Sequence, residues 1–146
     1  MMNEVKMEFS AISENEGFSR MAAAAFIAPL NPTMEEMADV KTAVSEAVTN
    51  AIIHGYEGRK GTVYMTMRRI EQEIYLEIRD EGCGIENIDR ALEPLYTTKG
   101  NMERSGMGFS FMEAFMDRLE VQSEVGKGTV VCMWKVLGRE MTYGND

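Results

Sequence analysis

The sequence predicts a single α+β domain spanning residues 1–146, a two-layer sandwich in which helices cover one face of a mixed, mainly antiparallel sheet. Segments with strand periodicity occur at the start, in the middle and at the end of the chain, with helical segments between them. This order lacks the regular strand-helix-strand alternation of parallel α/β folds. With 146 residues, of which 45% are hydrophobic, the chain is long enough to bury a core of its own.

The first two elements are predicted to be a strand and a helix. Val5–Phe9 alternates apolar and polar residues, which is typical of a half-buried strand. We expect Asn15 to cap a helix that runs to Ala28. Pro29 and Pro32 then interrupt the helical pattern and predict a short connection.

The second predicted helix is long and carries the first candidate site. Residues 33–36 read Thr-Met-Glu-Glu, which matches a capping box, and apolar residues then recur at helical spacing until Gly55. Glu46 and Asn50 lie one turn apart on this helix, so a carboxylate and a carboxamide share one face. Alone, such a pair is common on solvated helix surfaces. Its significance therefore depends on the motifs that follow.

Two hairpins are predicted in the second half of the chain. Residues 61–70 and 74–79 have strand character and are joined by a short polar turn. Residues 119–124 and 129–136 form the second hairpin, turned by Gly-Lys-Gly at 126–128. The apolar side chains expected in the core of the first hairpin are Met65, Met67, Leu76 and Ile78.

Two glycine loops allow a ligand to approach the backbone. Asp80 ends a predicted strand and precedes Gly82 and Gly84, which have no Cβ and permit a sharp turn. Residues 106–108, Gly-Met-Gly, are predicted to open a helix through about residue 117, whose N–H groups and positive dipole end suit phosphate. Between the loops, residues 86–105 are weakly periodic and longer than most connections, which predicts a lid.

Charge and composition argue against several classes of function. The chain carries 15 Lys and Arg against 24 Asp and Glu, and this net charge of -9 disfavours a direct nucleic-acid partner. The apolar run at residues 21–28 is too short to span a membrane and no signal-peptide pattern occurs, so we expect a cytoplasmic protein without a membrane partner. Cys83, Cys132 and the single His54 have no metal-ligand spacing, so the cysteines are expected to be reduced thiols.

Four motifs in order make the chain similar to the GHKL ATPase and kinase superfamily, which includes gyrase, the heat-shock chaperone, sensor histidine kinases and mismatch-repair ATPases. The matching segments are the Glu46 to Asn50 helix, Asp80-x-Gly82-x-Gly84, Gly106-x-Gly108 and Gly126-x-Gly128-Thr129. Within the superfamily the chain resembles the anti-sigma factor branch over nearly its whole length, most clearly at residues 45–56 and 103–109. The resemblance implies the ATP-binding fold of the superfamily and a homodimer.

The resemblance also implies roles for the motif residues, with ATP and Mg²⁺ as cofactors. Glu46 would be the general base for phosphoryl transfer, Asn50 would coordinate Mg²⁺, and Asp80 would bind the adenine amino group. The other implied nucleotide-binding residues are Gly82 and Gly84 in the second motif, Thr97, Thr98, Lys99 and Arg104 in the lid, Ser105, Gly106, Met107 and Gly108 at the phosphates, and Thr129 in the adenine pocket.

The implied function is that of an anti-sigma factor and protein-serine kinase. Such a protein sequesters a sporulation sigma factor in its ATP-bound state and phosphorylates a serine of an anti-anti-sigma partner. A general-stress anti-sigma kinase of the same branch would differ only in its partner, and an ATP-gated binding module would lack transfer. A sensor histidine kinase module is disfavoured because the only histidine, His54, lies inside the first motif.

Arg20 is a candidate contact for a protein partner. It is the only basic residue between Lys6 and Lys41 and lies on a predicted helix among acidic residues. An exposed arginine can bind a carboxylate through two hydrogen bonds, and arginine is enriched at binding hot spots. The alternative is an ion pair with Glu16, one helical turn away.

Overall fold

The computed structural model describes residues 1–93 and 108–138, and nearly all elements predicted in these ranges are present. The strands are β1 (Met2–Ser10), β2 (Thr62–Ile70), β3 (Glu73–Asp80), β4 (Arg118–Glu124) and β5 (Gly128–Val136). The helices are α1 (Glu14–Ile27), α2 (Met34–Thr49), α3 (Ile88–Ala91) and α5 (Phe109–Phe115), together with a 3₁₀ turn η1 (Ala28–Leu30) and a π-helical segment η2 (Asn50–Gly55).

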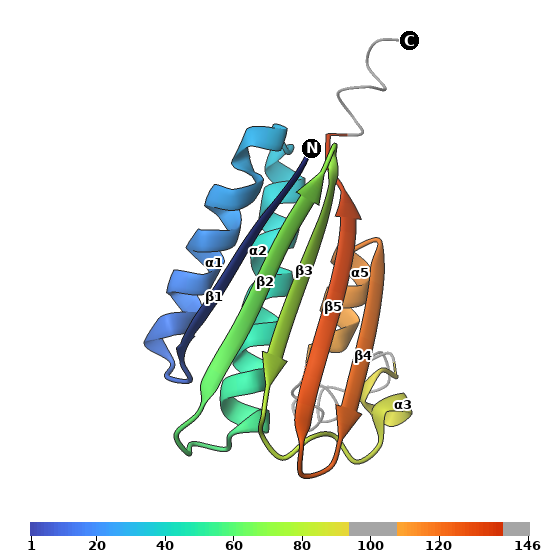
Figure 1. Ribbon diagram of the computed structural model, residues 1–146. Coiled ribbons are helices and arrows are strands. Elements are labelled where there is room, and N and C mark those ends of the chain that lie inside the picture. The colour runs from blue at the N-terminus through green and yellow to red at the C-terminus, as the bar shows by residue number, and fades with distance from the viewer. Residues whose placement is uncertain (94–107, 139–146) are drawn as a thin grey trace.

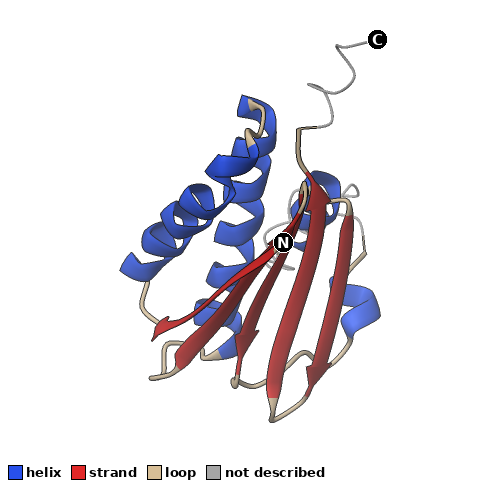
Figure 2. Cartoon of the chain, turned by 45° about the horizontal axis from the view of Figure 1, so that its top comes forward, coloured by secondary structure: helices blue, strands red, loops and turns tan. Residues whose placement is uncertain are grey.

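The strands form one sheet in the order β1-β2-β3-β5-β4, and all four pairings are antiparallel. Figures 1 and 2 show α1, α2 and α5 on one face of this sheet. The predicted two-layer sandwich is confirmed, and the sheet, which was predicted to be mixed and mainly antiparallel, is antiparallel at every pairing of the described strands. Because β5 lies beside β3, Asp80 at the end of β3 pairs with Thr129 at the start of β5.

The two long helices begin differently. The Thr33 hydroxyl accepts the N–H of Glu36 at 3.0 Å, and the Glu36 carboxylate accepts the N–H of Thr33 at 2.9 Å, so the predicted capping box of α2 is confirmed. The predicted cap of α1 is wrong. Ser13 occupies the N-cap position, and the Asn15 side chain instead donates to the Ser10 carbonyl at 2.9 Å.

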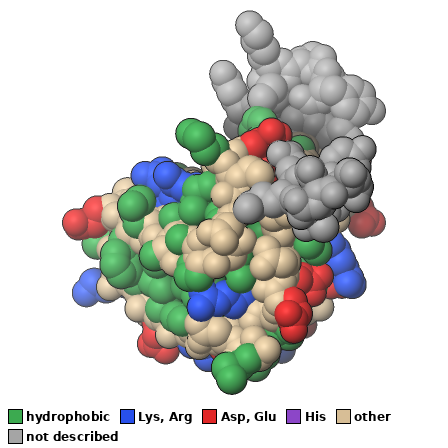
Figure 3. Space-filling view, turned by 90° about the horizontal axis from the view of Figure 1, so that it is seen from above, with side chains coloured by type: hydrophobic (Ala, Val, Ile, Leu, Met, Phe, Trp, Pro, Cys, Tyr) green, Lys and Arg blue, Asp and Glu red, His purple; other side chains and the backbone are tan. Residues whose placement is uncertain are grey.

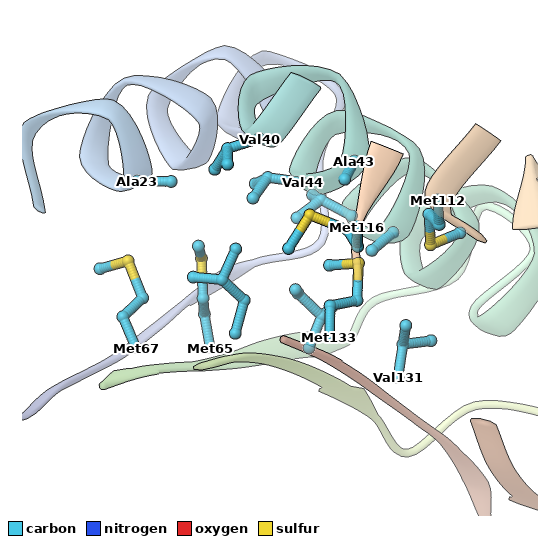
Figure 4. Close-up of a cluster of buried hydrophobic side chains, with 14 of the residues drawn as sticks. Ala23, Val40, Ala43, Val44, Met65, Met67, Met112, Met116, Val131 and Met133 are labelled. Carbon is cyan, nitrogen blue, oxygen red and sulfur yellow. The ribbon is translucent and has the colours of Figure 1, made fainter. Parts of the chain in front are cut away.

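Methionine fills much of the space between the helices and the sheet (Figure 4). Met65 and Met67 of β2, Met133 of β5 and Met112 of α5 are all at most 2% exposed. An unbranched thioether adapts to irregular gaps in a core. The four core residues predicted from the first hairpin, Met65, Met67, Leu76 and Ile78, are confirmed as buried.

Both predicted hairpins are present, with small changes at their ends. Glu73 belongs to β3, so the first turn contains only Glu71 and Gln72, and Glu71 adopts a φ of 54°. The helix predicted after the third motif begins at Phe109 and ends at Phe115, slightly before its predicted end.

The predicted lid falls largely outside the described residues. Its described part, residues 86–93, contains the short helix α3, where the Asn87 side chain accepts the N–H of Arg90 at 3.0 Å. Within residues 1–93 and 108–138, no helix combines the length and hydropathy that crossing a membrane requires. The face shown in Figure 3 mixes apolar, acidic and basic side chains, so the negative charge is not gathered into one patch there.

Candidate functional site

Glu46 and Asn50 lie at the point where α2 changes into a wider helical turn. The N–H of Tyr56 bonds to the carbonyl of Ala51 at 3.0 Å, which is the spacing of a π-helix. π-Helical turns are rare in proteins, but those that occur are often found at functional sites. Asn50 is the first residue of this segment and is 8% exposed. The predicted helical face is therefore confirmed, and it ends in an irregular turn that the sequence did not reveal.

A pocket lies beside this turn and encloses about 350 Å³, including the part open to solvent. It brings together η2, β3, β5, the loop after β3 and the first residue of α5. Of the residues predicted to bind a nucleotide, it contains Asn50, Asp80, Gly84 and Thr129. Its other lining residues are Ala47, Ala51, His54, Gly55, Ile78, Ile85, Phe109 and Val131. Apolar walls with a few polar groups are typical of small-molecule sites.

Asp80 supplies a buried carboxylate to this pocket, with only 6% of the residue exposed. Its Oδ1 accepts the N–H of Gly82 at 2.9 Å. Burial raises the pKa of the Asp80 carboxyl, and hydrogen bonds from the backbone of Gly82 and Thr129 oppose that rise. An ionised carboxylate only accepts hydrogen bonds, so it suits a ligand group with N–H donors.

The glycines around Asp80 are required by close backbone contacts. A Cβ on Gly82 would lie 2.1 Å from the carbonyl oxygen of Gly55, and a Cβ on Gly84 would lie 2.3 Å from that of Glu124. Gly84 also has a φ of 79°, which favours glycine. The second motif therefore packs between η2 and the β4–β5 hairpin, and Gly82 shapes the pocket without lining it.

The last motif requires glycine at position 128 because its backbone lies close to Asp80 at the end of β3. Gly128 has a φ of 121°, and a Cβ there would lie 2.1 Å from the carbonyl oxygen of Asp80. The next residue, Thr129, is 8% exposed and lines the pocket opposite Asp80. Ser123, which sequence reasoning missed, contacts the Thr129 hydroxyl at 2.8 Å.

Glu46 lies against the third motif. A Cβ on Gly108 would lie 2.0 Å from Glu46 Oε2, and Gly108 has a φ of 63° as the N-cap of α5. Burial raises the pKa of the Glu46 carboxyl, and the negative charge of Glu16 raises it further. A carboxylate with a raised pKa is a stronger base, which suits a general base acting near neutral pH.

Glu16, whose charge acts on Glu46, also connects α1 to α2. Glu16 Oε2 accepts the Ser45 hydroxyl at 2.9 Å and pairs with Arg20 at 3.3 Å. The Arg20 side chain is 41% exposed and does not line the pocket. The intrahelical pair considered for Arg20 is thus present, and a role in partner binding stays a prediction. Glu16 and Ser45 are far apart in sequence, and no local pattern indicated their contact.

Seven of the predicted nucleotide-binding residues lie outside the described residues. They are Thr97, Thr98, Lys99, Arg104, Ser105, Gly106 and Met107. Both cysteine thiols are free, and Cys83 donates from Sγ to the carbonyl of His54 at 3.1 Å.

The described residues suit a nucleotide whose base carries an N–H donor, together with a divalent cation. Asp80 offers a buried acceptor, Gly82 and Gly84 leave no Cβ in the loop that carries it, and the Asn50 amide supplies a hard oxygen of the kind that Mg²⁺ prefers.

Comparison with known proteins agrees with this geometry. Residues 9–135 match the family described as histidine kinase-like ATPase domain. The anti-sigma F factors of Bacillus thuringiensis (strain Al Hakam) and Bacillus anthracis (strain A0248) are each 56% identical over 146 residues, covering 99% of this chain and 100% of the relative.

Solved structures show the same fold at lower identity. The RsbU and RsbW domains of a Mycobacterium tuberculosis protein align with a TM-score of 0.63 and 17% identity over 92% of this chain and 32% of that one. The catalytic domain of histidine kinase ThkA aligns with a TM-score of 0.55 and 16% identity over 91% of this chain and 96% of that one. The chain therefore belongs to the histidine kinase-like ATPase family and, within it, to the anti-sigma F factors.

Proposed function

We propose that this protein is an anti-sigma factor and an ATP-dependent protein-serine kinase. In its ATP-bound state it sequesters a sporulation sigma factor, sigma F, and it phosphorylates a serine of an anti-anti-sigma partner. The observation that carries the proposal is the pocket lined by Asn50, Asp80 and Thr129, with Glu46 one helical turn before Asn50 and against Gly108. Identity of 56% with anti-sigma F factors supports the choice of sigma partner.

The pocket residues divide the work of binding ATP. Asp80 accepts a hydrogen bond from the amino group of adenine, and Thr129 is the second polar side chain of the base site. Asn50 is the residue proposed to hold Mg²⁺, which neutralises phosphate charge when bound. Gly108 lies against Glu46, and the proposal assigns the backbone N–H groups of the third motif to the phosphates.

Phosphoryl transfer requires mainly positioning and charge stabilisation, with one proton to remove. Glu46 accepts the proton of the partner's serine hydroxyl. As it does so, the serine oxygen forms a bond to the γ-phosphorus and displaces ADP, which keeps the electron pair of the broken P–O bond. The raised pKa of Glu46 makes its carboxylate a better base for this step.

Regulation by nucleotide follows from the lid residues in this proposal. Thr97, Thr98, Lys99 and Arg104 contact the γ-phosphate, so ATP and ADP favour different states of the partner surface. We further propose a cytoplasmic homodimer without direct contact to nucleic acid, consistent with the net charge of -9.

The experiment is a phosphotransfer assay with ATP and the anti-anti-sigma partner, comparing wild type with Glu46→Gln. The amide keeps the shape of the side chain and removes the base, so ATP affinity is expected to persist while transfer falls by about 100-fold or more. Glu35→Gln, on an exposed position of the same helix, is the matched control and should transfer like wild type.

Three results would count against the proposal. Transfer by Glu46→Gln within about threefold of wild type would remove the base assignment, because a general base contributes about 10²-fold or more. ATP-dependent sigma binding without any transfer would favour the ATP-gated binding module. Phosphohistidine on the chain itself, in place of phosphoserine on the partner, would favour a histidine kinase.

A further inference from the structure

Ser123 of β4 lies outside the four glycine and acid motifs, yet its hydroxyl makes three polar contacts at the base end of the pocket. The N–H of Ile85 donates to Ser123 Oγ at 2.7 Å. Ser123 Oγ lies 2.9 Å from the carbonyl oxygen of Gly128 and 2.8 Å from Thr129 Oγ1. Two of these partners, Ile85 and Thr129, line the pocket.

The direction of each hydrogen bond follows from counting protons. A serine hydroxyl has one proton to donate and two lone pairs to accept with. The carbonyl of Gly128 can only accept, so Ser123 must donate its proton there for that contact to be a hydrogen bond. The Ile85 N–H occupies one lone pair. The Thr129 hydroxyl then donates to the second lone pair, and all three contacts are satisfied together.

This arrangement determines what Thr129 offers to a ligand. Its proton is held by Ser123, so only lone pairs remain for the pocket. Thr129 is paired with Asp80 across β3 and β5, and directly opposed side chains lie on the same face of a sheet. The ionised Asp80 carboxylate is also an acceptor. The Asp80 carboxylate and the Thr129 hydroxyl therefore both act as hydrogen-bond acceptors toward a ligand.

We propose that Ser123 is a specificity-determining residue that, by holding the proton of Thr129, selects nucleotides whose purine carries an amino group over those with a carbonyl at the same position. Adenine presents an N–H donor at this edge, whereas guanine presents its O6 acceptor. This inference rests on the proposed ATP-binding function and names the residue that sets the choice of base.

The test is an equilibrium titration of ATP and of GTP against wild type and Ser123→Ala. Without Ser123 Oγ the Thr129 hydroxyl can rotate and donate into the pocket, so the ratio of ATP to GTP affinity is expected to fall about tenfold, the effect of one buried polar group left unsatisfied. Loss of the hydrogen bond to the Ile85 N–H should weaken the binding of ATP and of GTP alike, and so leave the ratio of their affinities unchanged. Ser123→Thr keeps the hydroxyl and should keep the wild-type ratio.

A double-mutant cycle with Thr129→Val separates the proposed mechanism from general disturbance of the pocket. In the Thr129→Val background no hydroxyl remains to be oriented, so Ser123→Ala should leave the ATP to GTP ratio unchanged. If Ser123→Ala does not fold, Ser123→Cys keeps the shape with only weak hydrogen bonding and should show the same fall.

The outcomes distinguish this inference from the function on which it rests. If wild type binds neither nucleotide, the proposed function fails. If wild type prefers ATP and Ser123→Ala keeps that preference, or loses it equally in the Thr129→Val background, the role of Ser123 is refuted while ATP binding stands.

Discussion

Replacing Gly82 with alanine is expected to weaken nucleotide binding through a backbone clash with Gly55, a residue that lines the pocket. The new Cβ would lie 2.1 Å from the carbonyl oxygen of Gly55 and 2.3 Å from its carbonyl carbon. Both are backbone atoms, which cannot rotate away as a side chain can. The φ of Gly82 is not in the left-handed region, so the cost comes from this contact alone.

The size of the effect follows from the bonds that hold the loop. Relieving the clash requires the loop and η2 to separate by about 1 Å in a closely packed region. The bond from the N–H of Cys83 to the carbonyl of Gly55, now 2.8 Å, would then exceed hydrogen-bond range. The bond from Gly82 to Asp80, at 2.9 Å, would be disturbed as well. Loss of the first bond and weakening of the second correspond to about 1–3 kcal/mol of unfolding free energy.

The nucleotide affinity should fall at least about tenfold, because the loop displacement misplaces the Asp80 carboxylate and tenfold corresponds to about 1.4 kcal/mol. Urea denaturation measures the stability change and calorimetric titration measures ATP affinity, both at a temperature where the variant is folded. Gly17→Ala is the control. Its Cβ would meet only Arg20 Nη2 at 3.7 Å in a helix, so it should gain about 0.5–1 kcal/mol.

A Gly82→Ala variant with stability within about 0.5 kcal/mol and ATP affinity within about twofold of wild type would show that the clash with Gly55 is relieved at no cost.

Single contacts of Glu16, Glu36 and Arg20 each have a measurable effect. Glu16→Gln removes a negative charge that raises the pKa of Glu46, so the base stays ionised to lower pH and the acid limb of the transfer rate should shift to lower pH. Glu36→Ala removes a buried carboxylate that accepts the backbone N–H groups of Thr33 and Gly138. Its free energy of unfolding, measured by urea denaturation, should fall by about 2–3 kcal/mol, and that of the exposed variant Glu35→Ala by much less. Arg20→Ala loses only a surface ion pair of about 0.2–0.5 kcal/mol, yet is expected to weaken binding of the sigma or anti-anti-sigma partner at least about tenfold in titrations.

Each of these has a result that contradicts it. An acid limb that moves equally in the exposed Glu14→Gln variant would show that the charge of Glu16 does not act on the base specifically. Equal losses of stability in the Glu36 and Glu35 variants would mean that the buried carboxylate contacts are unimportant. Partner binding by Arg20→Ala equal to wild type would leave the pair with Glu16 as the explanation of this arginine.

Much of the secondary structure was predictable because its causes are local. Each of the following patterns spans only a few residues: the capping box at Thr33, the glycine turn at the start of β5, and the alternation that buries Met65 and Met67. The failure at Asn15 has the same origin. Several polar residues near the start of α1 can cap it. The contact of Asn15 with Ser10 depends on the path of the chain between the end of β1 and the start of α1.

The candidate site residues were predicted for a different reason, and their roles stay predictions. Glu46 and Asn50 stand in the first, Asp80 in the second and Thr129 in the last of four ordered motifs, which are specific as a set. Local pattern alone did not indicate the π-helical turn that begins at Asn50, because its widened bonding depends on the packing of η2 against the loop after β3.

Tertiary structure alone decided which side chains support the motif residues. Ser123 meets Thr129 because β4 and β5 pair in one register, and it meets Ile85 because the second motif packs on that hairpin. Glu16 meets Ser45 because α1 packs on α2. Such contacts join segments far apart in the chain, and their geometry depends on strand order and helix packing, which no short stretch of sequence contains.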